Sequence, residues 1–404
     1  MTMNRKRIIW AGTAATFVAV ITAYSWFTLS RPFAAVQLQT VYRASTLAST
    51  EPSLPWPASG EAAISINGSQ LRLNNAEQKA VPTASTAKVM TALCVLDKKP
   101  LRGNESGPTL TLTQADVDLY NAYIAKNGSV AAVAVGEKIT ERQALEALML
   151  PSANNLADSL VIWAFGSMQN YVKYANEKAA RLGMHDSYFA DASGFSPATV
   201  STAEDLVLLG EAALAHGSLA TIVKEQTATI PVAGLIRNRN YLLGQNGNIG
   251  IKTGNTDEAG GVFLFAADVV PSGQTTTVRV VGAIMNAPDL RTAMEGSVPF
   301  SAAVSNSFET DTVIKAGTVI GHYTAPWGQQ VDAVAQKDVV ILRWKNQKVT
   351  PTVSINNVTS TARDKEVVGS VSAKSTYAES QTPVILKGSF TPPSAWWRLT
   401  HPEF

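Results

Sequence analysis

The sequence is poor in the residues that build disulfides, metal sites and histidine-based active sites. Its 404 residues include one cysteine, Cys94, and four scattered histidines. One cysteine excludes an intrachain disulfide, and without clustered cysteine and histidine ligands we expect no metal and no other cofactor. Cys94 lies in the apolar run 89–96, which favours a buried side chain over a nucleophile. A triad of serine, histidine and aspartate would have to use one of the four histidines, and no G-x-S-x-G sequence accompanies them.

Charged residues are also scarce, and the two signs nearly balance. Asp, Glu, Lys and Arg make up 16% of the chain, and the formal net charge is +2. This small excess does not support nucleic-acid binding or electrostatic attachment to a membrane, so we expect no nucleic-acid partner. Hydrophobic residues make up 46%, enough for a sizeable core, and the length favours two folded units with extensions.

One long uncharged run stands near the N-terminus. Three basic residues at 5–7 precede 23 uncharged residues at 8–30, enough to cross the hydrocarbon core of a membrane as a helix. A secretory hydrophobic region is usually shorter, about 7–15 residues, and no clear A-x-A cleavage site follows. Trp10 and Trp26 suit the two membrane interfaces. We therefore predict that residues 1–31 form a cytoplasmic stub and an uncleaved signal anchor, and that the rest of the chain lies outside the bacterial cell membrane.

The rest of the chain divides into four predicted segments. Residues 32–57 are a polar, proline-containing linker, which we expect to be irregular. In 58–308, strand patterns flank a mainly helical middle, which predicts one antiparallel sheet with flanking helices and an inserted helical subdomain. Residues 309–390 carry short β-like runs between turn residues and predict a small all-β domain. The tail, 391–404, contains two adjacent tryptophans, which could lie at a membrane interface or cap the β domain.

Local signals place the elements of the segment 58–308 more closely. Thr140 and Gln143 have the spacing of a capping box at a helix start, and so do Ser201 and Glu204. The predicted elements are a β-hairpin at 62–66 and 71–73, a helix at 86–96, strands at 248–253, 262–270 and 276–285, and a helix at 288–305.

Three short motifs carry the candidate chemistry, and the first is the S-x-x-K sequence from Ser85 to Lys88. Residues three apart on a helix share a face, so Lys88 could take a proton from the Ser85 hydroxyl. The lysine must be neutral to act as a base, and burial, the helix N-terminus or a second cation would lower its pKa. Alone, the motif is equally typical of an ordinary helix start.

The second motif is Ser152-Ala153-Asn154, which follows an apolar helix that stops at Pro151. A break at this point would direct the Ser152 hydroxyl and the Asn154 amide into a cleft. The alternative is a simple turn between two helices with a capping residue.

The third motif is Lys252-Thr253-Gly254, in a predicted strand. Lys252 offers a charge and Thr253 a hydrogen bond to a substrate carboxylate, while Gly254 leaves room for a substrate backbone along the strand. The alternative is the end of a strand before a turn.

The order of the three motifs, separated by 67 and 100 residues, is unlikely to arise by chance. Longer stretches around them add to the pattern: AEQKAVPTASTAKVMTALCVL, LEALMLPSANNLADSL, SYFADASGFS and GIKTGNTDEAG. Over about residues 58–305, and more loosely beyond, the chain resembles the D-alanyl-D-alanine carboxypeptidases, which are low-molecular-mass penicillin-binding proteins.

The resemblance implies an α+β domain of the β-lactamase and transpeptidase type. It implies a serine enzyme that removes the terminal D-alanine of peptidoglycan stem pentapeptides through an acyl-enzyme, and that β-lactams inhibit. Ser85 would be the nucleophile, Lys88 the base and Ser152 a proton relay. The remaining implied roles are a substrate amide ligand at Asn154, a carboxylate site at Lys252 and Thr253, and an oxyanion hole of the backbone N–H groups of Ser85 and Asn255.

Other readings of the same motifs stay open. A β-lactamase of the same fold would need a glutamate that positions water, and no E-x-x-L-N sequence follows Ser152. A DD-endopeptidase or a transpeptidase differs only in the bond cleaved or the acceptor. A catalytically inactive wall-binding or scaffold protein is the reading from a different class. Asn255 stands where many members have His or Tyr, which implies an altered substrate preference.

Overall fold

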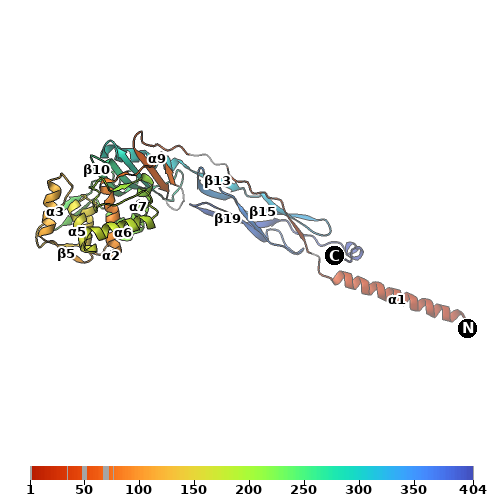
Figure 1. The fold of residues 1–404 in the computed structure, drawn as a ribbon. Helices are drawn as coiled ribbons and strands as arrows, with labels where there is room; N and C mark the ends of the chain where they lie inside the picture. The colour runs from red at the N-terminus through yellow and green to blue at the C-terminus, as the bar shows by residue number, and fades with distance from the viewer. Residues whose placement is uncertain (1, 34, 48–51, 67–71, 76, 404) are drawn as a thin grey trace. The chain divides into compact units, whose positions relative to one another are not determined.

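The computed structural model describes residues 2–33, 35–47, 52–66, 72–75 and 77–403, and Figure 1 labels its helices and strands. The chain divides into two compact units. Pro52–Phe308 form the first, called the central unit below. Met1–Glu51 and Glu309–Phe404 together form the second, called the terminal unit.

The central unit is built on a five-stranded antiparallel sheet with strands from both ends of its sequence. In the order β10-β11-β12-β2-β3, the early strand β2 pairs with the late strand β12, so the predicted sheet is confirmed. The turn of the predicted hairpin, 67–71, lies outside the described residues. The strands are β2 Glu61–Ile66, β3 Arg72–Asn74, β10 Asn248–Thr256, β11 Gly260–Val269 and β12 Val278–Ala287.

Two helices cover opposite faces of this sheet. Helix α9, Leu290–Asn306, places Phe300 against Phe265 of β11, with ring centroids 6.1 Å apart. Helix α7, Ala203–Ala215, packs Gly210 closely against the neighbouring Leu264. Because successive strand side chains point to opposite faces, α9 and α7 sandwich the sheet.

The remaining elements of the central unit lie between β3 and β10 in the sequence. They match the mainly helical middle that the sequence predicts. The helices are α2 Lys88–Lys98, α3 Gln114–Ile124, α4 Glu141–Met149, α5 Asn154–Phe165, α6 Met168–Arg181 and α8 Gly217–Ile222, and short strands are β4 Val81–Pro82, β5 Thr109–Thr111, β6 Lys138–Thr140, β7 Val200–Ser201, β8 Thr227–Ile230 and β9 Gly234–Arg237.

Of the two predicted capping boxes, one is confirmed and the other is wrong by one residue. Thr140 caps α4, and its side chain and that of Gln143 bond reciprocally to each other's backbone N–H. Helix α7 is instead capped by Thr202, whose hydroxyl accepts from the Asp205 N–H. Ser201 belongs to β7 and pairs with β4, so its backbone is committed to a strand.

The terminal unit contains a six-stranded sheet in the order β1-β14-β15-β19-β18-β17, and Figure 1 shows β15 and β19 side by side. Strand β1 comes from the stretch expected to be irregular, and it pairs with β14. Its sequence, QLQT, is mostly polar, so an edge strand was not evident from hydrophobic alternation. The strands are β1 Gln37–Thr40, β13 Phe308–Ile314, β14 Val319–Thr324, β15 Gln330–Ala335, β16 Val339–Trp344, β17 Thr352–Ile355, β18 Val367–Lys374 and β19 Glu379–Lys387.

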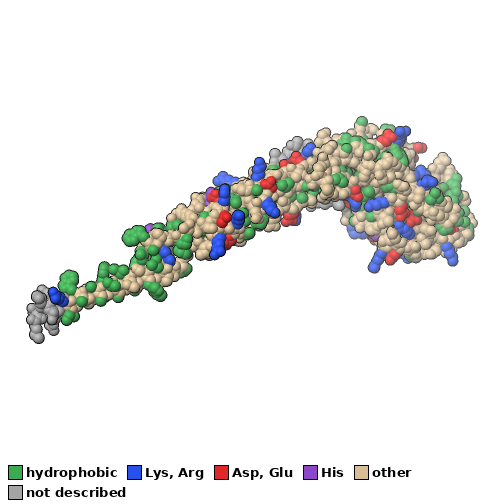
Figure 2. Space-filling model, turned by 180° about the vertical axis from the view of Figure 1, so that it is seen from behind, with side chains coloured by type: hydrophobic (Ala, Val, Ile, Leu, Met, Phe, Trp, Pro, Cys, Tyr) green, Lys and Arg blue, Asp and Glu red, His purple; other side chains and the backbone are tan. Residues whose placement is uncertain are grey.

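Two helices complete the terminal unit: α1, Thr2–Ser30, and the short α10, Ala395–Thr400. Among the described residues, one helical segment, Arg7–Ser30, is long and apolar enough to cross a membrane, a property that signal sequences and membrane anchors share. Figure 2 shows hydrophobic side chains distributed along this helix.

Candidate active site

Ser85 lies in a short 3-10 helix, η1, Ala84–Ala87, which leads directly into α2. The helix predicted at 86–96 is therefore present, but a tighter turn forms its beginning. Ala84 has a φ of 45°, in the left-handed region that residues other than glycine rarely adopt. This strained turn holds the half-buried Ser85 ahead of the helix, with its hydroxyl oxygen 2.8 Å from the Lys88 Nζ.

The amine of Lys88 is fully buried and has three polar partners. It donates to Ser85 Oγ, to Asn154 Oδ1 at 2.7 Å and to the Ser193 carbonyl oxygen at 2.8 Å. Burial lowers the pKa of Lys88 to about 7, against the opposing charges of Asp191 and Asp158. The amine is therefore poised to exchange a proton with Ser85 near neutral pH.

A loop centred on Asp191 supports this arrangement. The Asp191 carboxylate accepts hydrogen bonds from the backbone N–H groups of Gly194 and Phe195 at 3.1 and 3.0 Å. Gly194 has a φ of 69°, and a Cβ there would lie 1.8 Å from the Ala84 carbonyl oxygen. The loop thus presses against η1 and presents the Ser193 carbonyl to Lys88. In the sequence this loop corresponds to the turn-forming stretch Asp-Ala-Ser-Gly at 191–194.

Ser152 and Asn154 lie on the turn that joins α4 to α5. Ser152 is 2% exposed and has a φ of 70°, and its hydroxyl has no hydrogen-bond partner among the residues that the structure describes. The Asn154 N–H donates to the Ser129 carbonyl at 2.7 Å, and its side chain accepts from Lys88. The structure therefore connects Asn154 directly to Lys88, whereas Ser152 is a buried, unpaired hydroxyl two residues earlier.

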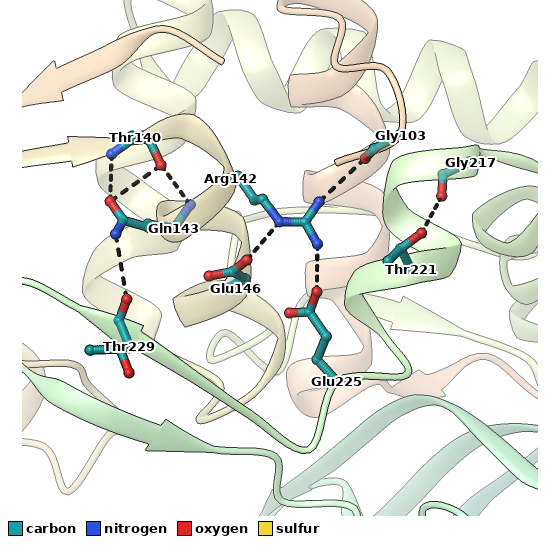
Figure 3. Close-up of polar contacts among 9 residues, drawn as sticks. All are labelled: Gly103, Thr140, Arg142, Gln143, Glu146, Gly217, Thr221, Glu225 and Thr229. Atoms are coloured by element: carbon teal, nitrogen blue, oxygen red, sulfur yellow. Dashed lines mark hydrogen bonds and ion pairs between the residues drawn. The ribbon is translucent and has the colours of Figure 1, made fainter. Parts of the chain in front are cut away.

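Helix α4 carries this turn, and a cluster around Arg142 fixes the helix in place. Figure 3 shows the Arg142 guanidinium between Glu146, at 2.8 Å, and Glu225, with a further bond to the Gly103 carbonyl. The same view shows the Thr140 capping box, whose Gln143 side chain also donates to the Thr229 carbonyl. These contacts bind α4 to two neighbouring segments, so the turn after it has a defined position.

Lys252 and Thr253 are buried in the middle of β10, which continues to Thr256, three residues beyond the predicted strand 248–253. A Cβ on Gly254 would lie 3.0 Å from the Ser85 backbone nitrogen, so β10 runs directly beside η1, and a larger residue would have to push the two segments apart. The next residue, Asn255, is exposed. The third motif therefore reaches the same place as the first.

The charge of Lys88 acts on the second buried lysine, Lys252. Burial, then the charges of Lys88 and Arg239, hold the pKa of Lys252 well below its usual value. Arg239 also lowers the pKa of Lys88. It is held to the Ser152 turn, where its Nε donates to the Pro151 carbonyl at 2.9 Å. Arg239 is a third cation of the site, and a single sequence contains no signal that distinguishes it from other arginines.

The fold and this arrangement define an α+β transpeptidase-type protein. The central unit has the fold of the Streptomyces K15 DD-transpeptidase, with a TM-score of 0.54 and 26% identity, covering 63% of this chain and 98% of that one. The model of the D-alanyl-D-alanine carboxypeptidase family, peptidase family S11, matches residues 56–289. The chain belongs to this family.

Relatives in the family include both carboxypeptidases and endopeptidases. The chain is 32% identical over 203 residues to a D-alanyl-D-alanine carboxypeptidase of Streptomyces sp. (strain K15), covering 46% of this chain and 67% of that protein. It is 32% identical over 231 residues to a D-alanyl-D-alanine endopeptidase of Escherichia coli (strain K12), covering 54% and 69%. It is 25% identical over 315 residues to the carboxypeptidase DacA of the same organism, covering 76% of each chain, a stretch longer than the central unit.

Proposed function

We propose that the protein is a serine D-Ala-D-Ala carboxypeptidase that removes the terminal D-alanine from the stem pentapeptides of peptidoglycan. The observation that carries this proposal is the fully buried Lys88 amine, 2.8 Å from Ser85 Oγ, with its pKa lowered to about 7. Such an amine is neutral in about half of the molecules at neutral pH and can act as a general base.

In the proposed acylation, neutral Lys88 takes the Ser85 proton, and Ser85 Oγ attacks the carbonyl carbon of the penultimate D-alanine. The backbone N–H groups of Ser85 and Asn255 stabilise the oxyanion. The close approach of Gly254 to the Ser85 nitrogen supports this pairing. Loss of one such donor typically costs about 10²–10³ in rate.

The C–N bond then breaks, and the leaving D-alanine takes a proton through Ser152, whose buried hydroxyl has no other partner in the described structure. Water hydrolyses the acyl-enzyme and restores the Ser85 hydroxyl. A β-lactam would acylate Ser85 in the same way.

The carboxylate of the substrate is proposed to bind at Lys252 and Thr253, with Arg239 as an additional cation. Without a substrate, burial and then the neighbouring charges of Lys88 and Arg239 disfavour the charged form of Lys252. A carboxylate beside Lys252 would reverse this balance and favour its charged form. Asn154, already oriented by Lys88, would bind the substrate amide.

We further propose that α1 anchors the protein in the bacterial cell membrane, with both folded units outside the cell. The central unit would be the catalytic domain, corresponding to the predicted segment 58–308, and 309–390 the accompanying β domain. The apolar segment Arg7–Ser30 and the basic residues before it support this orientation.

The test is release of D-alanine from a pentapeptide by the full-length protein in detergent. We expect release by the wild type, a loss of at least about 10³-fold in Ser85→Ala, and unchanged release in Ser305→Ala, a serine on α9 outside the site. D-alanine release by Ser85→Ala at the wild-type rate would refute the assignment of Ser85 as the nucleophile.

An endopeptidase is the second candidate, because relatives named D-alanyl-D-alanine endopeptidases are 32% and 34% identical to this chain. Cross-linked muropeptide dimers separate the two functions. A carboxypeptidase trims pentapeptide and leaves the dimers, whereas faster conversion of dimers to monomers than of pentapeptide to tetrapeptide would establish the endopeptidase.

A further inference from the structure

The last helix of the chain contacts the end of the first. Arg398 of α10 donates from Nη2 to the Thr28 carbonyl oxygen at 3.0 Å and to the Arg31 carbonyl oxygen at 2.6 Å. In return, the Tyr24 hydroxyl of α1 donates to the Leu399 carbonyl at 2.8 Å. Residues about 370 positions apart in the sequence thus form a small polar interface.

These bonds fall where a helix most needs partners. The last four carbonyl oxygens of a helix accept no hydrogen bond from the helix itself. The negative end of the helix dipole also favours a cation at this position. The Arg398 guanidinium supplies both the donors and the charge to the end of α1. Although most described side chains of α1 are exposed, Thr28 is only 4% exposed at this contact.

The other side of α10 is attached to the β structure of the terminal unit. Trp397 packs against Trp327, with ring centroids 6.0 Å apart, and Trp327 in turn lies 5.8 Å from Phe33. Trp397 therefore caps the β structure, one of the two roles considered for the tryptophan pair. Trp396, beside it, is 75% exposed.

Exposed aromatic side chains also surround the end of α1. Trp26 is 73% exposed, and Phe27 is exposed beneath the Arg31 guanidinium, 5.0 Å from the ring centroid. Tryptophan and arginine at the end of an apolar helix are typical of the layer where lipid headgroups meet the hydrocarbon core. Trp396, on the helix that contacts this end of α1, adds another exposed aromatic side chain from a different part of the chain.

We propose that α10 is a clamp that joins the end of α1 to the β structure, and that Trp396 lies in the headgroup layer of a phospholipid bilayer. A bilayer is favoured as the partner because Trp396 is exposed on the helix that is hydrogen-bonded to the end of the long apolar helix α1. The clamp requires α1 to remain in the mature chain. It rests on the proposed membrane anchoring but not on the proposed reaction.

The single cysteine of the chain makes this directly testable. Cys94 is fully buried, and burial raises its pKa to about 12, so it should resist labelling. Trp396→Cys would be labelled with an environment-sensitive fluorophore in the full-length protein, reconstituted in vesicles of phosphatidylethanolamine and phosphatidylglycerol. The matched control is Lys337→Cys, an exposed site two residues beyond the end of β15. This strand, about 20 Å long, separates Lys337 from Trp327.

We expect the label at 396 to be blue-shifted and quenched several-fold more strongly by nitroxide lipids than the label at 337. Equal emission and quenching at the two sites would overturn the membrane contact. Arg398→Ala should speed amide hydrogen exchange severalfold at residues 28–33 and 397–402, while Arg363→Ala should leave it unchanged. Unaltered exchange in Arg398→Ala, or an intact mass of the mature chain that lacks α1, would overturn the clamp. D-alanine release, measured in parallel, tests the catalytic proposal separately.

Discussion

Lowering the pH below neutrality should stop the attack by Ser85, because it charges the Lys88 amine that must accept the proton. Burial brings the pKa of Lys88 from its ordinary 10.5 to about 7. At pH 7, about half of the amines are then neutral, against about 1 in 3,000 for an exposed lysine, a gain of roughly 10³ in available base. In free energy, the shift corresponds to about 5 kcal/mol of preference for the neutral amine.

The assay is kcat/KM for D-alanine release from pentapeptide between about pH 5 and pH 9, because kcat/KM reports the pKa of the free enzyme. We expect kcat/KM to fall by about tenfold per pH unit below pH 7. The acylation rate with a fluorescent penicillin should follow the same curve. A profile that stays flat down to about pH 5, or that rises only above about pH 9, would refute the reasoning.

Three further perturbations test the site and its support. Asp158→Asn removes a charge that raises the pKa of Lys88, so the acid limb of kcat/KM should move to lower pH. Gly194→Ala should slow penicillin acylation at least about tenfold, because its Cβ would collide with the η1 backbone. Gly183→Ala, at a similar φ but with only an ordinary contact to Leu208 at 3.9 Å, should not. Glu141→Gln should stabilise the protein at alkaline pH, because burial raises the Glu141 pKa from 4.5 to about 7.

The raised pKa of Glu141 determines the pH range in which the stability of Glu141→Gln should be compared with that of the wild type. The raised pKa means that the folded state holds the proton more tightly, so stability is greatest below pH 4.5 and falls as pH rises to about 7. Above neutral pH, the ionised, fully buried carboxyl therefore lowers the free energy of unfolding by about 3 kcal/mol. Thermal unfolding in detergent should show Glu141→Gln above the wild type at pH 8 but not at about pH 4.5. A stability gain of Glu141→Gln that does not depend on pH would contradict burial of the charged carboxylate as its cause. For Asp158→Asn, an acid limb of kcat/KM that moves to higher pH would contradict the prediction.

The sequence predicted the parts of the site that depend on short-range geometry. A helix places residues three apart on one face, and Ser85 and Lys88 are in hydrogen-bond contact as that rule requires. Arg239 and Asp191 were missed because each supports the site through a segment whose position only the fold determines: the Pro151 turn for Arg239, and the loop that presents the Ser193 carbonyl to Lys88 for Asp191. Arg239 acts through the carbonyl of Pro151, and Asp191 through the N–H groups of its own loop.

The ends of the chain show a related limit. Strand β1 is stabilised by pairing with β14, a contact between residues such as Gln37 and Thr324 that no local pattern encodes. The sequence gives no means of telling the two adjacent tryptophans apart, but their environments differ. Trp397 packs on Trp327, while Trp396 remains exposed. Only the folded chain distinguishes them.

The most direct test of the proposed site is to locate the covalent bond that a β-lactam forms. The full-length protein would be incubated with penicillin, digested, and mapped by mass spectrometry. We expect one adduct per chain, on the peptide that contains Ser85, and none in Ser85→Ala. An adduct on another residue, or one that persists in Ser85→Ala, would contradict the assignment of Ser85 as the nucleophile served by Lys88.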